Sequence, residues 1–170
     1  FSDVLSLEGV AATKNPSVPI FGVPTTAGTA SETTINYVIT DTKNKRKFVA
    51  VDPHDIPVVA FVDPDLTDGM PRGLKVATGL DALTHAIESV ITPGAWSLSD
   101  ALSMQTIRMI AQNLAKSVDG DKEAGEQMAY ASYITGMSYS NVGLGLVHGM
   151  AHPLGGRLGV DAAEGLPVQL

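Results

Sequence analysis

Residues 78–91 have the sequence TGLDALTHAIESVI. Four aliphatic residues in this stretch follow one another at intervals of three or four, namely Leu80, Leu83, Ile87 and Ile91. The spacing predicts a helix with one apolar face, and Pro71 suits its first turn. The same spacing recurs between Leu102 and Val118, and it predicts further helices over about 122–139 and after a break at Ser140-Asn141.

Before residue 70 the pattern is that of strands. Short β-branched runs are separated by Pro and Gly, over residues 18–23, 35–40, 47–51 and 58–62. We expect the middle two to form a hairpin around the charged turn 41–46, and the outer two to lie in a sheet buried on both faces. The sequence thus predicts an α/β part over 1–70 and an all-helical part over 71–170.

The composition excludes several classes of protein. Of the 170 residues, 44% are hydrophobic and 17% charged, which excludes a disordered polyelectrolyte. The net charge of −7 gives no basic surface for nucleic acid or anionic lipid, and no apolar run reaches the roughly 20 residues that span a bilayer. The absence of cysteine excludes disulfides, thiolate metal sites and cysteine nucleophiles, and it fits a cytoplasmic protein.

Two pairs of residues at helical spacing could bind a metal ion. Asp81 and His85 are four residues apart, as are His148 and His152, so each pair shares one helix face. Taken alone, Asp81 and His85 could also form an ion pair on the surface, and His148 and His152 could serve helix packing. Together, a carboxylate and imidazoles on two facing helices favour Fe(II) or Zn(II) with a position open to substrate, where the ion would polarise a carbonyl or alkoxide oxygen.

The stretch PTTAGTASE at 24–32 directly follows a predicted strand. Small hydroxylated residues around Gly28 would let backbone N–H groups approach an anion or a ribose. The stretch lacks the lysine of a P-loop and is not G-x-G-x-x-G. An ordinary strand-to-helix turn, with Thr29 and Glu32 as a capping box, fits it as well.

Four stretches in this order resemble the iron-dependent (group III) alcohol dehydrogenases. They are PTTAGTASE (24–32), KRKFVAVDPHDIPVVAFVDPDL (45–66), ATGLDALTHAIES (77–89) and SNVGLGLVHGMAHPLGG (140–156). The resemblance implies the second part of a Rossmann-like nucleotide-binding domain, followed by the first part of an all-helical metal-binding domain. It also implies reduction of a small aldehyde, or oxidation of the alcohol, with NAD(H) at one Fe(II), sometimes Zn(II).

The resemblance implies roles for single residues. Asp81, His85 and His148 match metal ligands, and His152 matches a histidine near the metal that takes part in proton transfer. Further positions match residues that contact the cofactor, namely Thr25, Thr26, Gly28, Val38, Lys47, Pro64, Leu66 and Thr67.

The sequence departs from the family in two places. Where the family has a fourth ligand, a histidine, position 162 is Ala, and Asp161 or Glu164 could offer an oxygen instead. The family's glycine-rich pyrophosphate loop would precede Phe1. We therefore expect a piece of a longer protein, with impaired activity and with exposed apolar faces that favour a homo-oligomer.

Two other functions remain open at this point. The chain could be a non-catalytic remnant that acts as a packing or oligomerisation module, which would bind no metal. It could also be a related metal enzyme of the glycerol dehydrogenase or dehydroquinate synthase type. Bound metal tests the first alternative, and a substrate screen tests the second.

Overall fold

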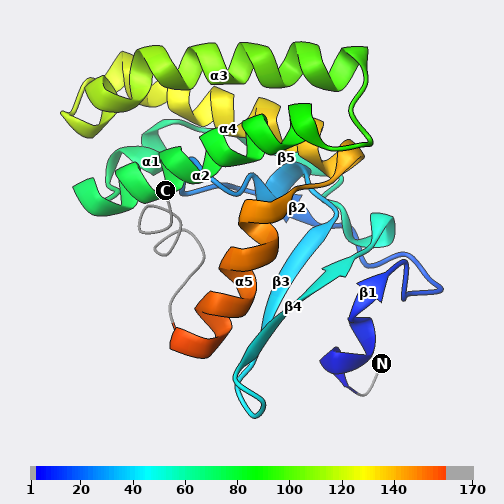
Figure 1. The fold of residues 1–170 in the computed structure, drawn as a ribbon. Helices are drawn as coiled ribbons and strands as arrows, with labels where there is room; N and C mark the ends of the chain where they lie inside the picture. Colours follow the sequence, from blue (N-terminus) through cyan, green and yellow to red (C-terminus); the bar gives the residue numbers. More distant parts are fainter. Residues whose placement is uncertain (1–2, 160–170) are drawn as a thin grey trace.

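The computed structural model describes residues 3–159 (Figure 1). The first part contains short strands and 3₁₀ helices: η1 (Val4–Leu7), β1 (Gly9–Val10), β2 (Phe21–Gly22), η2 (Ser31–Thr33), β3 (Asn36–Asp41), β4 (Arg46–Val51), η3 (Pro53–Asp55) and β5 (Val59–Ala60). The second part is helical: α1 (Asp65–Asp68), α2 (Arg72–Ile91), α3 (Ser97–Val118), α4 (Lys122–Val142) and α5 (Leu146–Leu158). This order confirms the predicted fold class. Within residues 3–159, no helix combines the length and the apolar character needed to cross a membrane.

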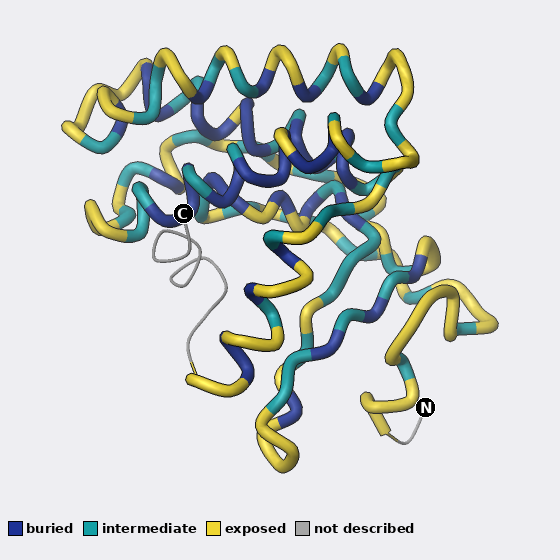
Figure 2. The backbone as a smooth tube through the Cα atoms, in the orientation of Figure 1, coloured by how far each residue is buried: buried dark blue, intermediate teal, exposed yellow. Residues whose placement is uncertain are grey.

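Helices α2, α3 and α4 pack against one another as a bundle above the strands, and α5 lies beside β3 and β4 and packs against β4 (Figure 1). Many of the buried residues lie where the three helices face one another (Figure 2). Their core consists of Ala27, Ala82, Ile110, Met128 and Ala131. Small residues keep α2 close to its neighbours, since a Cβ on Gly79 would lie 2.3 Å from Leu114 Cδ1.

The predicted hairpin is confirmed. Strands β3 and β4 pair antiparallel from Asn36 opposite Val51 to Asp41 opposite Arg46. The Asp41 carboxylate holds the turn, because it accepts hydrogen bonds from the backbone N–H and the side-chain amide of Asn44, at 3.0 and 2.8 Å. Strand β1 adds to the other edge of β4 in parallel, which places β4 in the middle of a three-stranded sheet.

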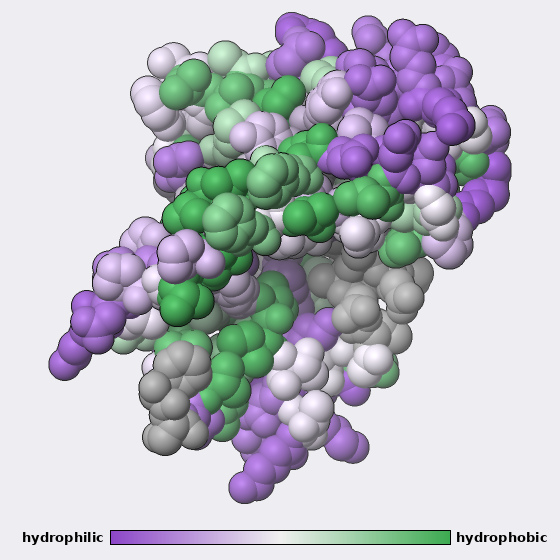
Figure 3. All heavy atoms as spheres, turned by 180° about the vertical axis from the view of Figure 1, so that it is seen from behind, coloured by the Kyte–Doolittle hydropathy of each residue, from purple (hydrophilic) through white to green (hydrophobic). Residues whose placement is uncertain are grey.

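Strands β2 and β5 pair in parallel but are shorter than predicted, and the expected burial on both faces is wrong for the described residues. One side of the pair lies against η2, where a Cβ on Gly22 would come within 2.6 Å of Glu32 Cβ. The rings of Phe21 and Phe61 stack on each other and remain 61% and 54% exposed, because no further strand or helix of residues 3–159 packs over them. Apolar residues also gather across the middle of the rear face (Figure 3).

Two local predictions are wrong. The helix break expected at Ser140-Asn141 lies further on, because α4 continues to Val142 and ends where Gly143 takes a positive φ of 84°. Thr29 does not cap a helix through a capping box. Instead, the N-cap of η2 is Ala30 in the left-handed conformation, and no side chain caps it.

Helix α5 approaches β4 closely at Gly156. A Cβ there would lie 2.6 Å from the backbone nitrogen of Lys47 and 2.9 Å from the backbone of Arg46. Since these neighbours are backbone atoms, they cannot move aside as a flexible side chain can. A glycine at this position therefore fixes how α5 sits on the sheet.

Gly156→Ala should destabilise the fold by about 1–3 kcal/mol, because the added methyl group overlaps the β4 backbone. Gly149→Ala is the matched control on the same helix, where nothing lies within 4 Å of the added Cβ, and it should be neutral or stabilise by up to about 1 kcal/mol. Urea unfolding measures both. Equal free energies of unfolding for the two variants would contradict the close packing of α5 on β4.

Candidate metal centre

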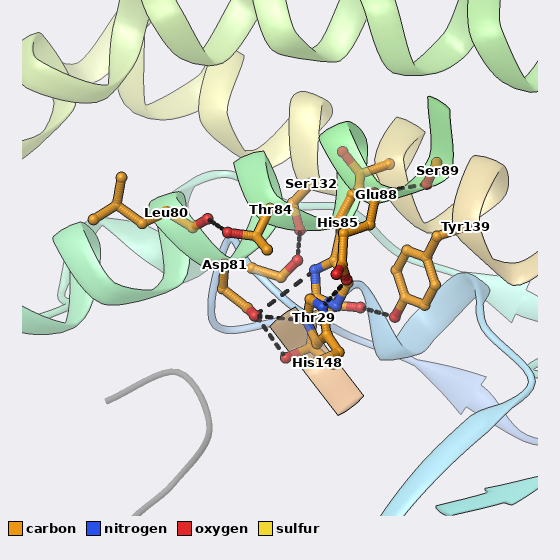
Figure 4. A network of polar contacts seen from close by, with 12 residues as sticks. Thr29, Leu80, Asp81, Thr84, His85, Glu88, Ser89, Ser132, Tyr139 and His148 are labelled. Carbon is orange, nitrogen blue, oxygen red and sulfur yellow. Dashed lines mark hydrogen bonds and ion pairs between the residues drawn. The ribbon is translucent and has the colours of Figure 1, made fainter. Parts of the chain in front are cut away.

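The centre of the molecule holds three side chains that could ligate one ion. Asp81 and His85 lie one turn apart on α2, and α5 brings His148 to the same place (Figure 4). All three are only 4% exposed, so the surface ion pair considered for Asp81 and His85 is excluded. One potential ligand atom from each residue lies within 4.8 Å of the other two.

The carboxylate of Asp81 is the common neighbour of both imidazoles. Its Oδ1 atom lies 3.4 Å from Nε2 of His148 and 3.8 Å from Nδ1 of His85. Its Oδ2 atom lies 3.5 Å from the hydroxyl of Thr29, which comes from the loop before η2. Two helices and one loop thus converge on a single carboxylate.

Stacked rings hold the imidazole of His85 in place. The rings of His148 and Tyr139 both stack on that of His85, with centroid distances of 4.2 Å and 4.3 Å. The Tyr139 hydroxyl donates a hydrogen bond of 2.5 Å to the carbonyl of Thr29. Tyr139 therefore connects α4 both to a candidate ligand and to the loop that contacts Asp81.

The surroundings of the three side chains shift their pKa values in different directions. Burial acts to raise the pKa of Asp81, but the nearby His85, His148 and His152 outweigh it and lower that pKa. Burial acts to lower the pKa of His148, but the carboxylates of Asp81 and Glu88 outweigh it and raise that pKa. At His85 the effect of burial dominates and lowers the pKa to about 4. A cation between these groups would therefore meet an ionised carboxylate and a neutral His85.

The donor set fits a divalent metal ion. Nδ1 of His85 and Nε2 of His148 are buried atoms without a hydrogen-bond partner, a costly state that an ion would relieve. Two ligand atoms, each about 2.1 Å from a metal at a tetrahedral angle, lie about 3.4 Å apart, which is close to the observed separations from Asp81. Two imidazoles and one carboxylate with open positions also form a set that suits Fe(II).

His152 stands one turn after His148 on α5. Its ring centroid lies 5.7 Å from that of His148, and its Nδ1 atom is buried without a hydrogen-bond partner. Burial, followed by the charges of His148 and Lys47, lowers the pKa of His152. A neutral imidazole close to the three candidate ligands can accept or deliver a proton.

A cavity of about 1020 Å³ opens between the β3–β4 hairpin and the helices that carry the site. Asp81, His85, His148 and His152 all contribute to its wall. Three of the positions predicted to bind the cofactor line it as well, namely Thr26, Val38 and Lys47. A cavity of this size suits an extended small-molecule ligand.

The other predicted cofactor positions do not line this cavity: Thr25, Gly28, Pro64, Leu66 and Thr67. Gly28 is buried against α2, where a Cβ would lie 2.8 Å from Thr78 Cβ. Pro64, Leu66 and Thr67 lie at the start of α1, and the Thr67 hydroxyl bonds the Pro64 carbonyl. The stretch around Asp161, Ala162 and Glu164, considered above for a fourth ligand, lies outside the described residues.

The sequence reasoning missed three residues of the site: Thr29, Glu88 and Tyr139. The spacing could have revealed Glu88, since it lies seven residues after Asp81 and three after His85, and therefore on the same helix face. For Tyr139 the sequence holds no such signal, because its contacts join segments more than 50 residues apart.

The chain belongs to the iron-containing alcohol dehydrogenase family. Residues 75–170 match the family model described as "Fe-containing alcohol dehydrogenase family, C-terminal", and residues 2–64 match "Iron-containing alcohol dehydrogenase". The family resemblance inferred from the four sequence stretches is thereby confirmed. These descriptions name iron, and the alternative of zinc gains no support from them.

Among curated relatives, the lactaldehyde reductase of Escherichia coli (strain K12) is 67% identical over 155 residues, which cover 91% of this chain and 41% of the relative. The chain thus spans about two fifths of the length of that relative. Among solved structures, a 1,3-propanediol oxidoreductase matches with a TM-score of 0.89 and 46% identity, covering 95% of this chain and 43% of that one. The sulfoacetaldehyde reductase from Bifidobacterium kashiwanohense in complex with NAD+ matches with a TM-score of 0.87 and 29% identity, covering 99% and 46%.

The imidazole of His85 should stay neutral in the metal-free chain as the pH falls from 8 to 5, since burial holds its pKa at about 4. Its contribution to stability is complete above the unfolded pKa of about 6.5 and declines toward pH 4, because only the unfolded chain takes up the proton there. Histidine-ring NMR, assigned with His85→Gln, measures this. Protonation of His85 near pH 6.5 would contradict its burial.

Proposed function

We propose that this chain carries the metal centre and part of the nucleotide site of an NAD-linked, Fe(II)-dependent alcohol dehydrogenase. Its reaction would be of the lactaldehyde to 1,2-propanediol type, given its similarity to lactaldehyde reductase. The observation that carries the proposal is the convergence of Asp81, His85 and His148 on the wall of one large cavity, with two imidazole nitrogens lacking partners.

The two parts of the chain would divide the work. Residues 1–70 would bind the dinucleotide, with Val38 and Lys47 of the hairpin and Thr26 of the loop on the cavity wall. Residues 71–170 would hold the metal and the substrate. The similarity to a reductase whose structure contains NAD+ supports this cofactor. The remaining predicted cofactor positions, Thr25, Gly28 and 64–67, would shape the loop and the start of α1 rather than the cavity wall.

Asp81, His85 and His148 would hold Fe(II), which when bound supplies a Lewis acid for the oxygen of the aldehyde or alcohol. NAD(H) supplies the hydride. The chain itself contributes orientation and a proton. Tyr139 and His148 keep the ring of His85 fixed by stacking. His152 faces the same cavity, where its neutral imidazole can take a proton from the alcohol and, in the reverse direction, its imidazolium form can donate one to the oxygen of the reduced aldehyde.

We also propose a cytoplasmic homo-oligomer. The lack of cysteine fits a reducing compartment, and the exposed Phe21, Val58 and Phe61 offer apolar area for contact with another copy. The net charge of −7 argues against nucleic acid as a partner, so a small aldehyde or alcohol remains the expected ligand.

Loading the purified chain with Fe(II) under anaerobic conditions should give close to one ion per chain after desalting. His148→Ala should lose that ion, because it removes one of three ligands and leaves the buried Asp81 less compensated. His54→Ala is the matched control, since His54 is exposed on η3 away from the cluster. Iron analysis measures both. Absence of iron from the parent chain would instead indicate a non-catalytic packing module.

His152→Gln should leave the bound iron in place but slow NADH oxidation by lactaldehyde about 10²–10⁴-fold, because the variant lacks an imidazole to deliver the proton. The rate is followed by NADH absorbance, and the iron content of the same sample serves as the control. A variant with full iron and an unchanged rate would show that His152 does not transfer the proton.

A further inference from the structure

Glu88 is a buried carboxylate next to the candidate ligands. It lies on α2 one turn after His85 (Figure 4). Only 2% of its surface is exposed. An ionised group at such depth is costly unless its oxygens are paired and hydrogen-bonded. Its partners therefore indicate what it does.

The two oxygens of Glu88 bind two neighbouring residues of α5. Oε1 accepts a hydrogen bond of 2.7 Å from the backbone N–H of Val147, and Oε2 lies 2.6 Å from Nδ1 of His148. The N-cap of α5, Gly145, has no side chain to cap the helix, and a Cβ there would lie 2.8 Å from Oε1. Glu88 thus caps α5 from the neighbouring helix, in space that Gly145 leaves open.

The hydrogen bond between Glu88 and His148 does more than cap the helix, because it determines which ring nitrogen of His148 carries the proton. A carboxylate has no proton to donate and Glu88 already accepts from Val147, so Nδ1 of His148, 2.6 Å from Oε2, carries the proton of this hydrogen bond. In the neutral ring, the lone pair then resides on Nε2, which faces Asp81 at 3.4 Å. The ring can meet the metal in this tautomer and orientation only.

We propose that Glu88 is a positioning residue, which fixes the proton of His148 on Nδ1 and so presents Nε2 to the metal. This inference rests on the proposed function. It also explains why one carboxylate joins α2 to α5, since the helix that supplies two ligands then sets the place and rotation of the third. Glutamine at position 88 keeps one acceptor oxygen for the backbone N–H of Val147 and turns an NH2 group, which only donates, toward Nδ1 of His148.

NMR of the metal-free chain tests the hydrogen bond without any metal. Long-range ¹H–¹⁵N correlation should show a slowly exchanging proton on Nδ1 of His148, assigned by its loss in His148→Ala. The signal should be lost in Glu88→Gln and persist in Glu126→Gln, the matched change on α4, where Glu126 bonds only the exposed Tyr130. A His148 ring without a proton on Nδ1 in the parent chain would overturn the inference.

Metal affinity separates positioning from helix capping. Competition with a chelator should show Fe(II) bound about 10–100-fold more weakly by Glu88→Gln than by the parent. In a His148→Ala background, where the weaker residual Fe(II) affinity is measured by direct titration, the same change should have little further effect, because Glu88 acts through His148. An equal loss in both backgrounds would mean that Glu88 only stabilises the helix, and it would overturn the inference.

The two proposals fail in different ways. A parent chain that keeps the protected Nδ1 proton but binds no Fe(II) would contradict the proposed function, while supporting the orientation of His148 by Glu88. A parent chain that binds Fe(II) with no loss of affinity in Glu88→Gln would support the proposed function and overturn the inference.

Discussion

The buried charge on one face of α2 constrains the rest of the structure. Asp81 and Glu88 are 4% and 2% exposed, and each would cost several kcal/mol if left without partners in the interior. The imidazole of His148 lies between them, with one nitrogen facing each carboxylate. The two carboxylates therefore fix the position of α5 against α2 through His148.

Small residues make that arrangement possible. Gly145 leaves room for the Glu88 carboxylate, Gly156 lets α5 approach β4, and Gly79 brings α2 against Leu114. On the other side of the site, the carbonyl of Gly28 accepts from the Ser132 hydroxyl and that of Thr29 from the Tyr139 hydroxyl. Helix α4 thus fixes the loop before η2 against α2. The loop and the helices that carry the candidate ligands form one hydrogen-bonded unit, so a change in either reaches the cavity.

The sequence predicts what depends on local periodicity. The helical spacing gave α2, α3 and α4 nearly to their ends, and the alternation of residues gave the β3–β4 hairpin. The i to i+4 pairs predicted Asp81, His85 and His148 as candidate ligands, because residues on one helix face can bind one ion, and the structure brings the three together. The burial of Phe21 and Phe61 was mispredicted, since an apolar strand does not specify what covers it. Tyr139 was not predicted as a residue of the site, because its role depends on tertiary contacts that leave no pattern in the sequence.

The charge balance of the site links its structure to its proposed chemistry. Two carboxylates face His148, and they raise the pKa of its imidazole while their own pKa values fall. The two carboxylates thus favour a positive charge between them. In the metal-free chain, a proton on Nε2 of His148 can supply that charge. A divalent ion would take the same lone pair, and Glu88 would still compensate the proton on Nδ1. On this proposal, the carboxylate that caps α5 compensates His148 in both states, so this part of the fold would need no rearrangement to accept an ion.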